Sequence, residues 1–183
     1  ALIVKKHTKV NIVFMAPPAH GPLRPFSNFT GNYDGAPKPM SDLHFKHGQK
    51  TYVIAEIGAN HNGDMELARK MIHRAKALGC NCVKFQSWDT TIFSRAVYEK
   101  NYFLGDDYRQ RTDYTLKDIV EEFAVSFDEL KELNQYSKDA GILFSTTPFN
   151  VEQLDQLLQL DPPYIKVASM DLTNPDMLAA AGE

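Results

Sequence analysis

The sequence predicts an α/β fold, the N-terminal half of a (β/α)8 barrel, and three observations support this prediction. From Thr51 onward, short apolar runs alternate with amphipathic helical segments, which is typical of repeated βα units around a parallel sheet. Four such units fit into roughly 130 residues, about half of the length of a complete barrel. Polar residues close each apolar run. A doubly wound open sheet would show the same alternation, but no glycine-rich phosphate motif follows the first strand, so the barrel is favoured.

The first fifty residues have a different character. Six of the ten prolines lie there, and only one short apolar stretch, around Ile12, has the composition of a strand. We therefore expect residues 1–50 to form an irregular, proline-rich N-terminal extension and residues 51–183 to form a partial barrel domain. The chain begins with Ala1 and stops within an expected helix, so we expect this domain to be truncated at its C-terminus.

The first βα unit begins with a buried strand at Tyr52–Ile57. A helix is expected from about Met65 to Leu78, because its apolar residues recur with a period of 3.6, and Gly79 suits the C-terminal cap. The second strand is Cys82–Gln86. A long insertion at 88–124, rich in tyrosine and charge, then interrupts the alternation, and it contains a short helix near 116–123. Long insertions on a βα scaffold are usually functional loops.

The alternation resumes after the insertion. Ser126 and Glu129 form a capping box, which predicts a helix from there to about Ala140. The remaining expected elements are a third strand at 142–146, a helix at 151–160, a fourth strand at 164–168 and a last helix opened by Asn174 and Pro175.

Composition and charge exclude several classes of protein. The chain is 43% apolar and 23% charged, with 20 Lys and Arg against 23 Asp and Glu, a net charge of −3. Such a balance, without a basic block, gives no reason to expect binding to nucleic acid or to an anionic membrane. The apolar run near Ile12 is far shorter than the roughly 20 residues of a membrane span, and no signal-peptide pattern follows it. We expect a cytoplasmic protein.

In a barrel the active site forms where the strands end, so the residues closing each strand are the candidates. Charged side chains within apolar strands are costly to bury unless they are paired or used. The candidates are Glu56, Asn60 and His61 after the first strand, Lys84 and Gln86 on the second, Thr147 after the third, and Lys166, Ser169 and Asp171 on or after the fourth.

Lys84 and Lys166 occupy corresponding positions in two strands. If both point into the barrel, they form an anion site, to which Thr147 and Ser169 would add hydroxyl groups and nearby helix starts would add N–H groups. The alternative is that each lysine pairs with Glu56 or Asp171 as a structural salt bridge. For two lysines at matching positions we favour ligand binding.

Glu56 is the best candidate for an acid, a base or a carboxylate near a metal, because a glutamate has little other reason to stand in this apolar strand. Its alternative role is to pair with Lys84. Asn60 and His61 lie just beyond it, where capping or loop hydrogen bonding explains them equally well. Asp171 has a comparable alternative as a turn or cap residue.

Four segments together resemble the ordered motifs of the sialic acid synthase family, which includes N-acetylneuraminate, legionaminate and pseudaminate synthases. The resemblance covers roughly residues 51 to 178. The segments are Ile54–Asp64, Val83–Gln86, Phe144–Phe149 and Ile165–Ser169.

This resemblance implies condensation of phosphoenolpyruvate with an N-acetylated aldose, such as N-acetylmannosamine, to give a nine-carbon 2-keto sugar acid and phosphate. By the same resemblance, Lys84, Lys166, Thr147 and Ser169 hold phosphoenolpyruvate. Gln86 faces the sugar, and Glu56 acts as the catalytic carboxylate beside a divalent metal, Mn²⁺ or Mg²⁺, touching it at most through water. We count Asn60, His61 and Asp171 among the substrate-binding candidates.

Two departures from the family pattern matter. Asp171 stands where neuraminate-type enzymes commonly have glutamate, which shortens the reach by one methylene. The family's two metal-binding histidines come from later strands, so we expect the metal ligands mostly outside this chain, and we expect the complete protein to be a homodimer. The competing interpretations are a non-catalytic phosphate-binding or assembly domain, and an aldolase-type barrel whose Schiff-base lysine would be Lys84 or Lys166.

Overall fold

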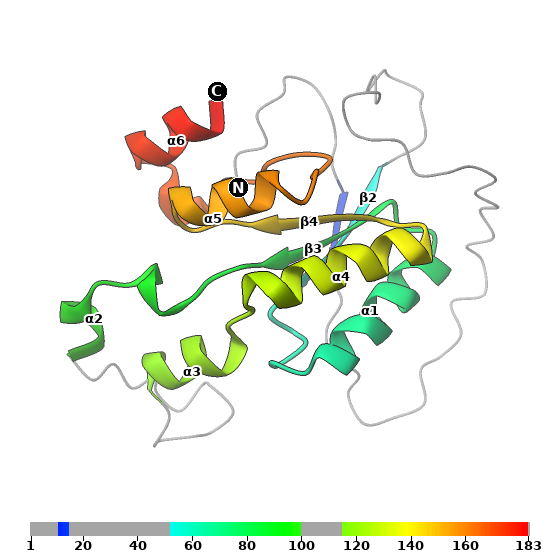
Figure 1. The fold of residues 1–183 in the computed structure, drawn as a ribbon, viewed down its shortest axis with the longest axis horizontal. Coiled ribbons are helices and arrows are strands. Elements are labelled where there is room, and N and C mark those ends of the chain that lie inside the picture. The colour runs from blue at the N-terminus through cyan, green and yellow to red at the C-terminus, as the bar shows by residue number, and fades with distance from the viewer. Residues whose placement is uncertain (1–10, 15–51, 100–114, 183) are drawn as a thin grey trace.

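The computed structural model describes residues 11–14, 52–99 and 115–182, which form a parallel α/β sheet structure (Figure 1). The sheet has four strands in sequential order, and all three neighbouring pairs run parallel. The strands are β1 (Asn11–Phe14), β2 (Val53–Gly58), β3 (Cys82–Gln86) and β4 (Leu143–Thr147). The register places Glu56 opposite Lys84, and Gln86 opposite Thr147.

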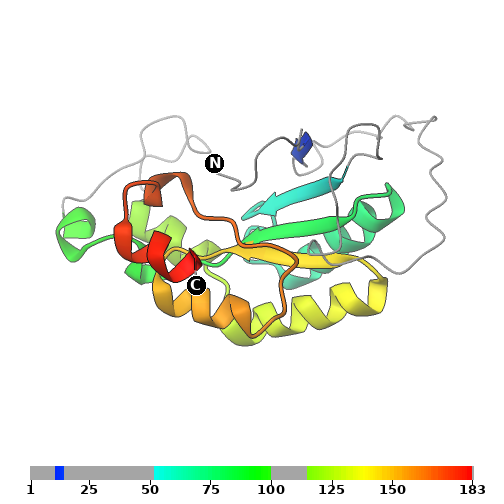
Figure 2. The same ribbon diagram turned by 90° about the horizontal axis from the view of Figure 1, so that it is seen from above.

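Helices follow or connect the strands. They are α1 (Met65–Ala77), α2 (Arg95–Glu99), α3 (Leu116–Phe123), α4 (Phe127–Ala140), α5 (Val151–Leu158) and α6 (Pro175–Gly182), with short 3-10 turns η2 (Thr90–Ile92) and η3 (Ser169–Asp171). Helices α1 and α4 pack side by side beneath the sheet, and α5 continues that layer (Figures 1 and 2). In a doubly wound sheet, helices cover both faces. Among the described residues the strands follow one another in sequential order and α1, α4 and α5 lie on one face of the sheet, which is consistent with a segment of a barrel.

The helix boundaries follow from caps that the sequence predicts. The Ser126 hydroxyl accepts from the Glu129 backbone N–H at 3.3 Å, and the Glu129 carboxylate accepts from the Ser126 N–H at 2.8 Å. This arrangement confirms the expected capping box of α4. At the other end of α4, Gly141 has a φ of 71°, a left-handed conformation that favours glycine. The expected helices at 65–78 and 116–123 are confirmed too.

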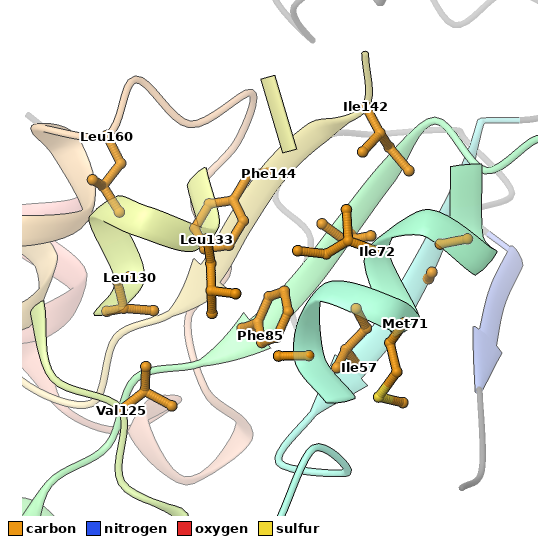
Figure 3. Close-up of a cluster of buried hydrophobic side chains, with 14 residues drawn as sticks. Ile57, Met71, Ile72, Phe85, Val125, Leu130, Leu133, Ile142, Phe144 and Leu160 are labelled. Carbon is orange, nitrogen blue, oxygen red and sulfur yellow. The ribbon is translucent and has the colours of Figure 1, made fainter. Parts of the chain in front are cut away.

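The core lies between the sheet and helices α1 and α4 (Figure 3). Alternate strand residues enter it, because successive side chains in a strand point to opposite faces. From the strands come Ala55, Ile57, Val83, Phe85 and Phe144, and from the helices come chiefly Met71, Ile72, Leu130 and Leu133. The residues between these strand positions face the other side of the sheet.

The predicted strand at 164–168 is wrong in this structure. Within this segment only Val167 forms an isolated β-bridge, and the sheet of the described residues ends at β4. The segment contacts β4 through a side chain instead: the Ser145 hydroxyl donates to the Tyr164 carbonyl at 3.2 Å. The apolar composition of a strand is present, but without a continuous backbone ladder the segment remains irregular.

Strand β1 falls in the region expected to be an irregular extension, at the one stretch that had the composition of a strand. Residues 15–51, with most of the prolines, lie outside the described residues, so the domain boundary near residue 50 stays a prediction. The same holds for residues 100–114 of the insertion. The described flanks of the insertion contain η2, α2 and α3.

Candidate active site

The face of the sheet opposite the helices changes character along the strands. Near the amino-terminal ends of the strands this face is mainly apolar. It is formed there by Tyr52, Ile54 and Cys82, with Leu143 and Tyr164 packed against them. One pleat further along the strands, Glu56 and Lys84 lie in register on neighbouring strands. Another pleat further, Gln86 and Thr147 are in register at the carboxyl edge. The predicted polar residues of β2, β3 and β4 therefore converge at this edge.

Lys84 is the centre of this polar layer. Its side chain is only 2% exposed, and its Nζ lies 2.8 Å from Oε1 of Glu56. The same ammonium group donates to the Thr147 hydroxyl at 2.8 Å and to the Phe85 carbonyl at 3.2 Å. The structure thus contains the ion pair with Glu56 that was the structural alternative for Lys84, and it also places the Thr147 hydroxyl, a predicted part of the anion site, in contact with the same ammonium group.

The electrostatics of Lys84 reflect its burial. Burial lowers the pKa of Lys84, Glu56 opposes that effect, and the positive charge of Lys166 lowers the pKa further. Lys166 is half-buried, and none of the ion pairs found among the described residues involves it. Two lysines close enough to influence each other, with a single carboxylate bound to one of them, leave positive charge that an anionic ligand could neutralise.

Gln86 reaches the same layer beside Gly58. A Cβ atom added at Gly58 would lie 3.2 Å from Oε1 of Gln86 and 3.5 Å from Oε1 of Glu56. Gly58 also has a φ of 55°, a conformation that side chains rarely adopt. A glycine at the end of β2 therefore lets the two side-chain oxygens approach the same point.

Asn60 and His61 are not brought into this layer. The Asn60 amide donates to the Ile57 carbonyl at 2.8 Å and so closes the turn after β2. His61 is fully buried next to Phe85, a core residue on the helix side of the sheet, and its Nδ1 accepts from the Gly63 N–H at 3.1 Å. Burial lowers the pKa of His61, against the opposing charges of Glu129 and Asp64. For both residues this geometry favours the alternative of a role in the turn.

Ser169 and Asp171 lie in η3, after the irregular segment that carries Lys166. Ser169 is exposed. Asp171 is buried, and its Oδ1 accepts from the Asn174 amide at 3.2 Å, as a turn residue before α6 would. Its second carboxylate oxygen, Oδ2, is buried without a hydrogen-bond partner among the described residues.

The sequence analysis missed Ser87, the residue after β3. Its backbone N–H and its hydroxyl both donate to the Thr147 carbonyl, at 3.1 and 3.0 Å. This double contact fixes the end of β4 and with it the Thr147 hydroxyl that contacts Lys84. The only signal in the sequence is a small polar residue directly after a buried strand, which is too common to be diagnostic.

In the parts of the chain that the structure covers, no three His, Cys, Asp or Glu residues are grouped so that they could hold a metal ion. Among the described helices, none has both the length and the apolar character needed to cross a lipid bilayer.

Comparison with known proteins gives a consistent result. Residues 71–183, more than half of the chain, match the model of the NeuB family. N-acetylneuraminate-9-phosphate synthase of Drosophila melanogaster is 36% identical over 131 residues, which are 71% of this chain and 34% of that protein. N,N'-diacetyllegionaminic acid synthase of Campylobacter jejuni is 34% identical over 131 residues, 69% of this chain and 37% of that protein.

Among solved structures, the sialic acid synthetase of Leptospira borgpetersenii, crystallised in complex with citrate, superposes with a TM-score of 0.56 at 30% identity. The match covers 73% of this chain and 41% of that one. The present chain thus spans about a third of the length of the curated relatives it matches.

Proposed function

This chain belongs to the NeuB family, and we propose that in the intact protein it supplies the phosphoenolpyruvate-binding half of a sialic-acid-type synthase. The reaction is condensation of phosphoenolpyruvate with an N-acetylated amino sugar, giving a nine-carbon 2-keto sugar acid and inorganic phosphate. The fold that goes with this proposal is the N-terminal half of a (β/α)8 barrel, completed by further βα units. The sequential parallel sheet with one helical layer supports it.

The observation that carries the proposal is the buried Lys84, which contacts Glu56 and Thr147 at the carboxyl edge of the sheet. Burying an ammonium group is expensive, and its partner Glu56 is itself 14% exposed rather than enclosed. The contact with the Thr147 hydroxyl satisfies a donor of the buried ammonium group in either role, but a purely structural ion pair is weakened by the positive charge of a second lysine nearby. An anion-binding site uses both lysines.

In the proposed mechanism Lys84 and Lys166 bind the carboxylate and phosphate of phosphoenolpyruvate, with the hydroxyls of Thr147 and Ser169 completing the contacts. Gln86 and Asp171 face the sugar. C3 of phosphoenolpyruvate forms a bond to the sugar aldehyde carbon, whose oxygen takes up a proton. Water then adds to C2, and the C–O bond between C2 and the phosphate breaks; phosphate leaves, and the added hydroxyl loses its proton to give the 2-keto acid. Glu56 is the group placed to hold or transfer a proton beside Lys84.

A divalent metal, Mn²⁺ or Mg²⁺, belongs to the proposal as well. Glu56 is the one carboxylate of the polar layer around Lys84 in the part of the chain that the structure describes, and it is already paired with Lys84. By themselves these residues do not make a metal site, so the ligands would come from elsewhere in the intact protein. When bound, the metal would polarise the sugar aldehyde as a Lewis acid.

The remaining parts of the proposal concern the setting of the reaction. We propose that the intact protein is a homodimer that works in the cytoplasm. Which amino sugar it uses is set by residues around Gln86 and Asp171. Asp171, shorter by one methylene than the usual glutamate, is the position at which we expect its sugar preference to differ from that of neuraminate-type enzymes.

The test is an activity assay of the intact protein with phosphoenolpyruvate, Mn²⁺ and a panel of N-acetylated amino sugars, with phosphate and the 2-keto sugar acid measured in parallel. We expect the two products in equal amounts. We expect Lys84→Ala and Lys166→Ala to raise the KM for phosphoenolpyruvate by about 100-fold or more, and Glu56→Gln to lower chiefly kcat.

Other outcomes would contradict the proposal in identifiable ways. Phosphoenolpyruvate binding without turnover on any sugar would favour the non-catalytic phosphate-binding domain. Irreversible labelling of Lys84 or Lys166 by pyruvate and borohydride would favour the aldolase-type barrel. Unchanged kinetics in all three variants would mean that these residues form a structural salt bridge.

A further inference from the structure

A second polar cluster lies beyond the carboxyl ends of β3 and β4, where the loops that follow these two strands meet. It consists of Asp89 and Thr91 from the first loop, and of Asn150 and Gln153 from the start of α5. The Gln153 amide donates to Oδ2 of Asp89 at 3.0 Å, and the Asn150 amide donates to the Thr91 hydroxyl at 3.1 Å. Each contact joins residues about 60 positions apart in the chain.

Gln153 is the central residue of this cluster. It is 4% exposed, and both ends of its amide are used: Oε1 accepts from the Phe149 backbone N–H at 2.9 Å while Nε2 donates to Asp89. These partners fix the orientation of the Gln153 amide. Its oxygen must face the N–H group of Phe149, and its NH2 group must face the carboxylate of Asp89.

Asp89 is suited to accept this bond. Burial alone would raise the pKa of Asp89, but hydrogen bonds from Thr91 and Gln153 outweigh that effect and lower the pKa. Its Oδ1 accepts from the Thr91 N–H at 2.8 Å, which leaves Oδ2 for Gln153. The carboxylate is therefore ionised at neutral pH and used on both oxygens.

A glutamine here is more than a helix cap. A residue three positions after the N-cap Asn150 commonly caps the helix start with a side-chain acceptor, and glutamate serves that purpose as well as glutamine does. Glutamate at this position would turn a second carboxylate towards Asp89. Only an amide both accepts from Phe149 and donates to Asp89.

The two loops carry the substrate-binding strand ends. Gln86 and Lys84 precede Asp89 on one side, and Thr147 precedes Gln153 on the other. Beyond the Ser87 contacts to Thr147, the two chain segments are joined by the edge-on packing of Trp88 against Phe149 and by the side-chain contacts of this cluster. The spacing between Lys84 and the Thr147 hydroxyl depends on how these ends are held.

We infer that the Asp89–Gln153 hydrogen bond is a clamp whose two members are positioning residues: it fixes the ends of β3 and β4 so that Lys84 and Thr147 together fit the anionic groups of phosphoenolpyruvate. This inference rests on the proposed function. It adds Asp89 and Gln153 to the residues on which substrate affinity depends, although neither is assigned a contact with the substrate.

The test compares Gln153→Glu with the double variant Asp89→Asn/Gln153→Glu in the intact protein. The single variant keeps size and capping but sets two carboxylates against each other, and we expect the KM for phosphoenolpyruvate to rise about tenfold, with a smaller change in kcat and in the KM for the sugar. The double variant reverses donor and acceptor, since the amide introduced at position 89 can donate to the carboxylate introduced at position 153. It should return the KM to within about threefold of the wild-type value.

Gln135→Glu is the matched control, because Gln135 donates to Asp139 at 2.9 Å in the same amide-to-carboxylate arrangement, exposed on α4. We expect it to leave the KM unchanged. An unchanged KM for phosphoenolpyruvate in Gln153→Glu, or an equal loss in the single and double variants, would overturn the clamp.

The clamp and the proposed function fail in different ways. If wild-type protein neither binds phosphoenolpyruvate in a calorimetric titration nor turns it over, the proposed function is wrong. If the wild type binds it and Gln153→Glu binds it equally well, the function stands and the clamp is wrong. If Gln153→Glu fails to fold, the test instead compares the double variant with Asp89→Asn alone. The clamp then requires the KM for phosphoenolpyruvate to be higher in Asp89→Asn than in the double variant.

Discussion

The two faces of the same three strands are both buried, yet they are stabilised by different means. Towards the helices, Phe85 and Phe144 stack with ring centroids 5.4 Å apart within an apolar cluster. On the opposite face, one residue away in the chain, Lys84 contacts Glu56 and Thr147. The helical face gains from every apolar atom it buries, whereas the polar face must recover the cost of desolvating a charge.

On these strands, residues that stabilise the fold and residues kept for another role lie on opposite faces. A well-packed apolar residue can be replaced only at a cost in folding free energy. A buried charge can be replaced by an apolar residue of similar shape at little cost, so its retention calls for another reason. Substitutions of neighbouring residues on the two faces test that separation.

The largest effect is expected for Phe85→Ala on the helical face. Phe85 is fully buried against Phe144 and His61, so truncation leaves a cavity in the core. We expect the free energy of unfolding of the intact protein to fall by about 3–5 kcal/mol, measured by denaturant titration. A loss below about 1 kcal/mol would contradict this expectation, because it would mean that neighbouring side chains fill the cavity left by Phe85.

Glu56→Gln should have the next largest effect. It removes the charge partner of a lysine that is 2% exposed, and breaking a buried pair from one side costs about 3 kcal/mol. The folded-state pKa of Lys84 already lies below its ordinary value and should fall further in the variant. The unfolded chain then binds more protons, so the stability of the variant should rise with pH more steeply than that of the wild type up to the ordinary lysine pKa. Parallel pH profiles would contradict this expectation.

A smaller effect is expected from His61, on the helical face. Its folded-state pKa is lowered by burial, despite the charges of Glu129 and Asp64, so below pH about 6.5 the unfolded chain binds more protons than the folded one. Stability should therefore decrease as the pH falls from about 6.5, and His61→Asn, whose Oδ1 can still accept from Gly63, should remove that decrease. Thermal unfolding midpoints between about pH 5 and 8 measure it, and an identical slope in the variant would show that other groups are responsible.

The smallest change in stability is expected for Lys84→Met, next to Phe85 in the same strand. Methionine has a similar shape and needs no ion-pair partner, and because the Glu56 side chain is 14% exposed, we expect water to replace the lost ammonium group more readily than at a fully enclosed carboxylate. We expect an unfolding free energy within about 1 kcal/mol of the wild type, by the same denaturant titration as for Phe85→Ala. A loss of about 3 kcal/mol or more would instead make the ion pair a main support of the fold.

Much of the fold could be predicted from periodicity and caps. The helices α1 and α4 follow a clear 3.6-residue pattern with a capping box or a C-terminal glycine, and three strands follow from short apolar runs, because these signals are local. The segment at 164–168 has the same composition, but a strand requires a partner, and pairing is not encoded locally.

The candidate site could be predicted in part. Placing Glu56, Lys84, Gln86 and Thr147 at one edge follows from parallel strands in order, and the register brings them together. His61 could not be placed, because whether a turn residue faces the core or the site depends on the turn conformation. Gln153 and Asp89 carried a weaker signal: Asn150 with glutamine three residues later suggests a cap, but nothing local reveals a contact 64 residues away.

We propose that the positive charge of Lys84 serves to bind an anionic substrate and is not needed for folding. The measurement that tests it most directly is a calorimetric titration of the intact protein with phosphoenolpyruvate, comparing the wild type with Lys84→Met. We expect the variant to stay folded and to lose affinity by about 100-fold or more. A folded variant that binds phosphoenolpyruvate as tightly as the wild type would contradict it.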